Sequence, residues 1–111
     1  MEKENALGQV RIADEVIEII AELALNDISG IYSAASRKGR KNQAKSIEVQ
    51  VVDDQVICNI EMFVSMNVKI PAVAEKVQTK VKAAIENMTG LQVSEVNVKI
   101  VGLIKEDAAE E

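Results

Sequence analysis

The chain has 111 residues, with 13 Lys and Arg against 18 Asp and Glu, and a formal net charge of −5. Its 48% hydrophobic and 28% charged content excludes general disorder, and its length is typical of a single domain. The sequence holds no His, which removes the Ser–His and Cys–His nucleophile pairs and the His-containing metal sites. Aromatic residues make up 2%, too few for a platform on which nucleic-acid bases stack.

The sequence carries no targeting signal that we recognise. Its N-terminal stretch contains acidic residues and lacks the apolar run of a signal peptide, and no run approaches the roughly 20 apolar residues of a membrane helix. A single cysteine forms no internal disulfide, which favours a reducing compartment. We therefore expect a cytoplasmic protein, and we nominate no catalytic, cofactor-binding or metal-binding residue.

The N-terminal third predicts an arm, a short strand and a helix. Residues 1–7 are polar and predict a loose arm, whereas residues 9–12 alternate polar and apolar side chains as a strand does. Asp14 is a candidate N-cap, and Gly30 can close the following helix in a left-handed conformation. The helix, of about 14 residues, is predicted from apolar side chains at three- and four-residue steps: Val16, Ile17, Ile20, Leu23, Ala24 and Ile28.

The middle of the chain predicts a β-hairpin. A possible short strand over residues 31–35 and a polar loop over 36–46 precede it. Alternating side chains over residues 47–51 predict its first strand, and Asp53 and Asp54 supply the turn. The return strand places one apolar set on a core face: Val56, Cys58, Ile60, Met62 and Val64.

The C-terminal third predicts a second helix and a final strand. Pro71 suits the first helical position, and Gly90 suits the left-handed residue that ends the helix. The apolar stripe comprises Ile70, Val73, Ala74, Val77, Val81, Ala84, Ile85 and Met88, and the wet side carries Lys76, Lys80, Lys82 and Glu86. The last strand is expected to place Val96, Val98, Ile100 and Ile104 on its apolar face.

These elements predict an α+β fold in the order β-α-(β)-β-β-α-β. We expect two amphipathic helices packed on one face of a small mixed, largely antiparallel sheet. A single domain would cover residues 1–104, followed by an acidic tail over residues 105–111. The opposite sheet face also carries apolar residues, either as scattered surface hydrophobes or as a surface for self-association: Ile57, Phe63, Val101 and Leu103.

Cysteine and carboxylate side chains have simple structural interpretations. Cys58 lies on the predicted core face, where a thiol behaves as a small hydrophobe. Glu15, Glu18 and Glu22 fall on one side of the first helix, a pattern that fits a solvated face better than a metal or acid–base site.

A basic cluster is the most informative surface feature. Five of the 13 basic residues fall within nine positions: Arg37, Lys38, Arg40, Lys41 and Lys45. Such a cluster can bind an acidic protein, an anionic membrane surface or a nucleic-acid backbone, or it can remain a solvated loop. We expect a protein partner through this cluster, with a nucleic-acid- or ribosome-associated module as the alternative.

Several short motifs recur in a recognisable order. They are Gly8-x-Val10-x-Ile12-x-Asp14-Glu15-Val16-Ile17, Ser29-Gly30-Ile31, Val68-Lys69-Ile70-Pro71, and Met88-Thr89-Gly90-Leu91-x-Val93-x-x-Val96-Asn97-Val98. Together they resemble the alkaline shock protein family, the Gls-type envelope stress response family of Gram-positive bacteria, over roughly residues 7–104. One departure is Met66-Asn67, where the family usually has Tyr-Gly. Asn67 tolerates a positive φ, so we expect the turn to survive.

The resemblance implies a non-enzymatic, cytoplasmic stress response protein that self-assembles. Some relatives lie beneath the membrane through a small membrane-anchored partner, and the family has no agreed catalytic residues to transfer. We therefore expect a self-assembling scaffold that docks to a membrane-anchored or cytoplasmic protein.

Overall fold

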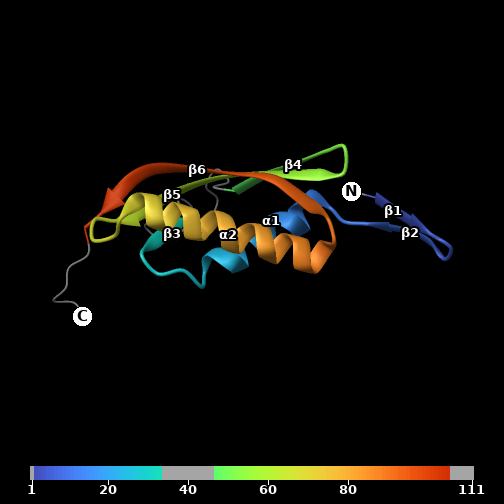
Figure 1. Cartoon of the computed structure of the whole chain (residues 1–111), viewed down its shortest axis with the longest axis horizontal. Helices are drawn as coiled ribbons and strands as arrows, with labels where there is room; N and C mark the ends of the chain where they lie inside the picture. Colours follow the sequence, from blue (N-terminus) through green and yellow to red (C-terminus); the bar gives the residue numbers. More distant parts are fainter. Residues whose placement is uncertain (1, 34–46, 106–111) are drawn as a thin grey trace.

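The fold, seen in a computed structural model that describes residues 2–33 and 47–105, has two helices packed beneath a curved sheet (Figure 1). The described elements run in chain order: β1 (Glu2–Asn5), β2 (Gly8–Arg11), α1 (Asp14–Leu25), β3 (Ile31–Ser33), β4 (Ile47–Val52), β5 (Gln55–Ser65), α2 (Ile70–Thr89) and β6 (Gln92–Ile104). The predicted α+β class and element order are confirmed, with β1 as an additional strand.

The central strand of the sheet is β5, which is paired along both of its edges. On one edge β6 runs parallel to it from Gln55 to Ser65. On the other, β4 and β3 lie antiparallel, β4 opposite the first half of β5 and β3 opposite the second. Because β5 and β6 are parallel, the chain must cross over between them, and α2 is that crossover. The sheet is therefore mixed.

The core lies between the sheet and the two helices. Every second residue of β5 is buried, and these residues are the set predicted for its core face: Val56, Cys58, Ile60, Met62 and Val64. The helices contribute Ile17 and Ala21 from α1, and Val77, Val81 and Ile85 from α2. Both helices thus cover the same face of the sheet, as the apolar patterns predicted.

The turns follow their local chemistry. Asp53 and Asp54 both have positive φ, 53° and 65°, as a two-residue hairpin turn between twisted strands requires. Gly90 ends α2 at φ 77°, and its N–H donates to the carbonyl of Glu86. Both predictions are confirmed. The turn at Met66 and Asn67 is present, as expected, although Asn67 does not use a positive φ; its N–H donates to the Ser65 hydroxyl at 3.0 Å.

The ends of α1 differ from the prediction. The N-cap residue is Ala13, which offers no side-chain acceptor, and Asp14 is the first helical residue. The helix ends at Leu25, so Gly30, at φ 88°, belongs to the connection to β3 and does not close the helix. Similarly, α2 begins one residue earlier than expected, at Ile70.

The N-terminal residues form a hairpin of their own. The loose arm predicted over residues 1–7 is wrong for Glu2–Asn5, which form β1 and pair antiparallel with β2. The two strands make a separate sheet, and Figure 1 shows this ribbon extending beyond the end of the helical layer. The strand predicted over residues 9–12 therefore exists, but it does not join the main sheet.

Two register shifts change which side chains of β6 face the helices. The β5–β6 pairing skips Ser94 and Val101, so each of these residues has no direct partner. Beyond Val101 the alternation is inverted, and Leu103 rather than Ile104 pairs with the buried Val64. By register Ile104 leaves the predicted apolar face, because a bulge adds one residue to the period of two. By exposure the predicted alternation continues, since Ile104 is half-buried whereas Leu103 is 54% exposed.

Candidate interaction surfaces

The predicted basic cluster lies outside the described residues. Arg37, Lys38, Arg40, Lys41 and Lys45 all fall within residues 34–46, and the acidic tail beyond Lys105 falls within residues 106–111. Partner binding through the basic cluster therefore stays a prediction. The candidate surfaces that follow come from residues 2–33 and 47–105.

The structure does not gather the predicted self-association residues into one patch. Ile57 and Phe63 are half-buried on the sheet face away from the helices, at well-separated positions along β5. Phe63 covers Gly102 closely, since a Cβ on that glycine would lie 2.6 Å from the ring atom Cε2. Val101 is 40% exposed at a bulge, and Leu103 is 54% exposed on the helix side of β6.

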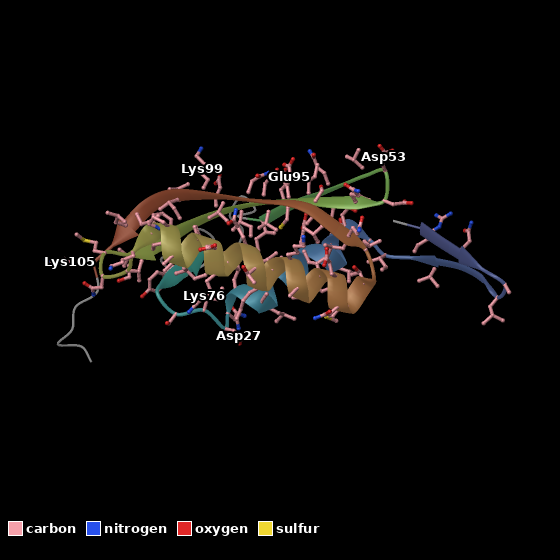
Figure 2. The ribbon with its side chains drawn as sticks, in the orientation of Figure 1. Asp27, Asp53, Lys76, Glu95, Lys99 and Lys105 are labelled. Atoms are coloured by element: carbon pink, nitrogen blue, oxygen red, sulfur yellow. The ribbon has the colours of Figure 1, made fainter. Side chains whose placement is uncertain are left out.

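The outward sheet face carries a polar network between β5 and β6. The Asn97 amide donates to the side-chain oxygen of Asn59 at 2.9 Å and to a carboxylate oxygen of Glu95 at 3.1 Å. Lys99 pairs in register with Glu61 of β5. Figure 2 shows Glu95 and Lys99 rising from the same side of the sheet, away from the helices. Both hydrogen bonds of Asn97 are exposed to solvent.

An exposed apolar row on α1 was missed by the sequence analysis. Val16, Ile19 and Leu23 are 47%, 52% and 58% exposed, and their i, i+3, i+7 spacing puts them along one side of the helix. The prediction placed Val16 and Leu23 in the buried stripe, which is wrong. Ile19 could have indicated this row from the sequence, because it makes the apolar part of the helix wider than one buried face.

Carboxylates border this apolar row. Glu15 and Glu22 are exposed, and Glu18 is half-buried on the same side of α1. The exposed part of the helix therefore combines an apolar row, named here the α1 stripe and defined as Val16, Ile19 and Leu23, with an adjoining line of negative charge. No group of three or more candidate metal-ligating side chains occurs among the described residues.

Met88 is an exposed apolar residue of α2. It was predicted in the buried stripe of that helix, but it is 70% exposed in the last turn, and the prediction is wrong. The predicted wet position of Glu86 is also wrong. Its carboxylate is half-buried and accepts a hydrogen bond of 2.9 Å from the N–H of Val93, which joins the end of α2 to the start of β6.

Cys58 is a core residue, as predicted. Burial, and to a smaller extent the negative charge of Glu18, raises the pKa of the Cys58 thiol from 9.0 to about 12. A thiol in this state has almost no thiolate at neutral pH, and the thiolate is the nucleophile. Its position in the sheet interior gives it a packing role.

Neither described helix is both long and apolar enough to cross a bilayer.

Comparison with known proteins finds one family model and several relatives that match nearly the whole chain. The sequence model of the alkaline shock protein 23 family, described as having a cell envelope-related function, matches residues 2–105. The uncharacterized protein YqhY of Bacillus subtilis is 33% identical over 117 residues, covering 98% of this chain and 87% of the relative. The uncharacterized protein YloU of the same organism is 31% identical, covering 93% and 94%. No solved structure matches the chain.

A third relative is named as a stress response regulator. The stress response regulator gls24 homolog of Streptococcus pyogenes is 29% identical over 105 residues, which cover 86% of this chain but only 59% of that relative.

Proposed function

Since the chain belongs to the alkaline shock protein 23 family, whose function is related to the cell envelope, we propose that it is a non-enzymatic envelope stress response protein. It acts as a cytoplasmic scaffold that associates with copies of itself and docks to a protein partner, which is membrane-anchored or cytoplasmic. The similarity to a relative named as a stress response regulator supports the stress response part of this proposal.

The α1 stripe is the observation that carries the docking role. Three large aliphatic side chains, each about half exposed, lie along one side of a two-layer domain that has an ample core elsewhere. Burying these side chains against the core or a partner would be favourable, and this stabilisation is absent while they remain in water. A contiguous row of this kind is typical of a surface that another protein covers.

The charge beside the stripe indicates the chemistry of that partner. Glu15 and Glu22 flank the apolar row. A partner therefore complements this surface best if it has apolar side chains with cations beside them. An amphipathic helix with one basic border fits this description, because helix-in-groove recognition reads side chains at three- and four-residue spacing. The proposed occupant is therefore a basic amphipathic segment of a protein partner.

Affinity purification of the full chain from its native cells tests the docking role. The parent is compared with a variant carrying Ile19→Gln and Leu23→Gln, and with a matched control, Ala83→Gln, on the exposed side of α2. The expected result is a partner with a basic amphipathic segment that the parent and the control retain and the α1 variant loses. Equal retention by all three chains would overturn this assignment of the surface.

Analytical ultracentrifugation tests the self-association. We expect the weight-average mass to rise with protein concentration, whereas a strict monomer at high concentration would contradict a scaffold.

The alternative of a nucleic-acid-associated module rests on the basic cluster alone. Salt-sensitive RNA or DNA binding that is lost when Arg37, Lys38, Arg40 and Lys41 become Glu would favour it instead.

A further inference from the structure

Among residues 2–33 and 47–105, the β6 side of the sheet has an edge without a strand partner. β6 (Gln92–Ile104) is the longest strand, and within residues 2–33 and 47–105 it pairs only with β5. Its other edge therefore presents backbone N–H and C=O groups without a strand partner in that part of the chain. Such an edge is a template for adding another strand.

The regular part of this edge is its centre. The skipped residues Ser94 and Val101 bracket an uninterrupted run, in which Glu95 to Ile100 pair one to one with β5. An antiparallel strand can therefore align with this run without meeting a bulge. The bulges at its two ends limit the pairing to about six residues and so restrict its register.

The side chains of this run are self-complementary. The outward-facing residues are Glu95, Asn97 and Lys99. The negative Glu95 and the positive Lys99 each lie two residues from the central Asn97. When two such strands lie antiparallel about a two-fold axis at Asn97, each Glu95 stands opposite the Lys99 of the other strand. Opposite charges directly across an antiparallel pair are favourable, and like charges are unfavourable.

We propose that two copies of this chain associate through the β6 edges, antiparallel about a two-fold axis at Asn97. The two four-stranded sheets then form one continuous sheet across the dimer, with a Glu95–Lys99 pair on each side of the axis. The proposal rests on the self-association proposed above and names its surface. An interface of this type is isologous, so the same residues serve both copies.

The helix side of the edge is also compatible with a second copy. In this register Val96 lies opposite Val98 of the other strand, so two aliphatic side chains meet on the apolar face. Val98 and Ile100 are only half-buried in the single chain, which leaves part of their surface for the second copy to cover. Centring the axis on Glu95 or on Lys99 would place like charges opposite each other. Centring it on Val96 or Val98 would leave both charges without an opposite charge across the axis, so Asn97 is the centre that pairs them.

One contact touches the same edge from within the chain. The Gln78 side chain of α2 donates a hydrogen bond of 3.0 Å to the carbonyl of Val96. That oxygen has two lone pairs and can accept a second bond from a neighbouring strand. Gln78 is exposed, so its side chain can also turn away without leaving a buried group unpaired.

Charge reversal tests the pairing on the full chain. Glu95→Lys places Lys opposite Lys99 in a homodimer, and Lys99→Glu places Glu opposite Glu95. Each single variant should weaken self-association at least about fivefold in sedimentation experiments, a change that the usual size of such cross-strand terms supports. A mixture of the two variants should form heterodimers at close to the parent affinity, because both cross-axis pairs are then opposite in charge.

A matched control separates this effect from net charge. Glu48→Lys changes the same charge on the outward face of β4, across the sheet from β6, and Glu48 is likewise exposed. It should leave the self-association unchanged. Thermal unfolding of each variant verifies that the monomer remains folded. If Glu48→Lys weakens association as much as Glu95→Lys does, the β6 pairing is wrong.

Asn97→Cys gives an independent geometric readout. Directly opposed residues of an antiparallel pair have Cα atoms about 4.5 or 5.5 Å apart, within the range of a disulfide. Mild oxidation should therefore yield a covalent dimer, whereas Gln50→Cys on the outward face of β4 should not. The native Cys58 is buried and does not compete.

The two proposals fail in different ways. A chain that associates with unchanged affinity in every β6 variant, and forms no Asn97→Cys dimer, would overturn the β6 pairing but leave the scaffold role standing. A chain that stays monomeric at every concentration would overturn both.

Discussion

A side chain on Gly30 would collide with Val68. A Cβ at that glycine would lie 2.7 Å from the Cγ1 atom of Val68, and the φ of Gly30 is 88°. The Gly30 carbonyl also accepts a hydrogen bond of 2.8 Å from the N–H of Ser65. The motifs Ser29-Gly30-Ile31 and Val68-Lys69-Ile70-Pro71, far apart in the sequence, therefore meet at one corner, where the chain enters β3 and leaves β5.

Replacing Gly30 by Ala should destabilise the fold by about 2 kcal/mol or more, because positive φ and a close contact act together. Thermal unfolding should show a Tm lower by roughly 8 °C or more for a domain of this size. Gly90→Ala is the matched control, since its φ is 77° but a Cβ there meets nothing within 4 Å. Equal losses for both variants would show that the Val68 contact adds nothing.

Truncating the neighbour should relieve part of the Gly30→Ala penalty. In a chain with Val68→Ala, the Cγ1 atom is gone and only the backbone strain at residue 30 remains. The two substitutions should therefore be non-additive, as expected of residues in contact. Strict additivity in a double-mutant cycle would contradict the proposed collision.

Removing the Glu86 carboxylate should loosen the α2–β6 connection. Glu86→Ala leaves the half-buried N–H of Val93 without its acceptor, which costs about 1–3 kcal/mol. Glu86→Gln keeps an oxygen in place and should lose less. Chemical denaturation measures both, with the exposed Lys82→Ala as a control expected to stay within about 0.5 kcal/mol of the parent.

Cys58 should make the fold less stable at high pH. Because burial raises the pKa of the thiol from 9.0 to about 12, the native state keeps a proton that the unfolded chain releases above pH 9. The stabilising contribution is therefore complete below pH 9 and is lost as the pH rises toward 12. In urea titrations across this range, the parent should lose stability more steeply than Cys58→Ala. Parallel pH profiles would refute the assignment.

Two adjacent isoleucines of α1 should respond in opposite ways. Ile20 is 5% exposed, so Ile20→Gln places a polar group in the core and should lower the free energy of unfolding by about 3 kcal/mol. Ile19 is 52% exposed, and Ile19→Gln should change stability by about 0.5 kcal/mol or less. Urea denaturation distinguishes them. A large loss for Ile19→Gln would mean that the α1 stripe serves the fold rather than a partner.

The candidate surfaces were less predictable than the fold. The basic cluster and the four apolar sheet residues were chosen by composition and alternation, and alternation fails at a bulge. Val101 and Leu103 therefore fall on different faces, and Ile57 and Phe63 are too far apart along β5 to form one patch with them. The α1 stripe was hidden because a helix that is apolar over most of its circumference gives no local sign of which side the sheet will cover.

The sequence alone determined the features that depend on side chains within a few positions of one another. These are the two helices, the turn at Asp53 and Asp54, the left-handed residue Gly90 that ends α2, and the alternating burial of β5. Tertiary structure decided the parallel pairing of β6, its two bulges and the separate N-terminal ribbon. It also decided the β6 edge around Asn97, which has no strand partner in the part of the chain that the structure describes. These features depend on which distant strand supplies the hydrogen bonds, and tertiary context rather than local propensity decides that pairing.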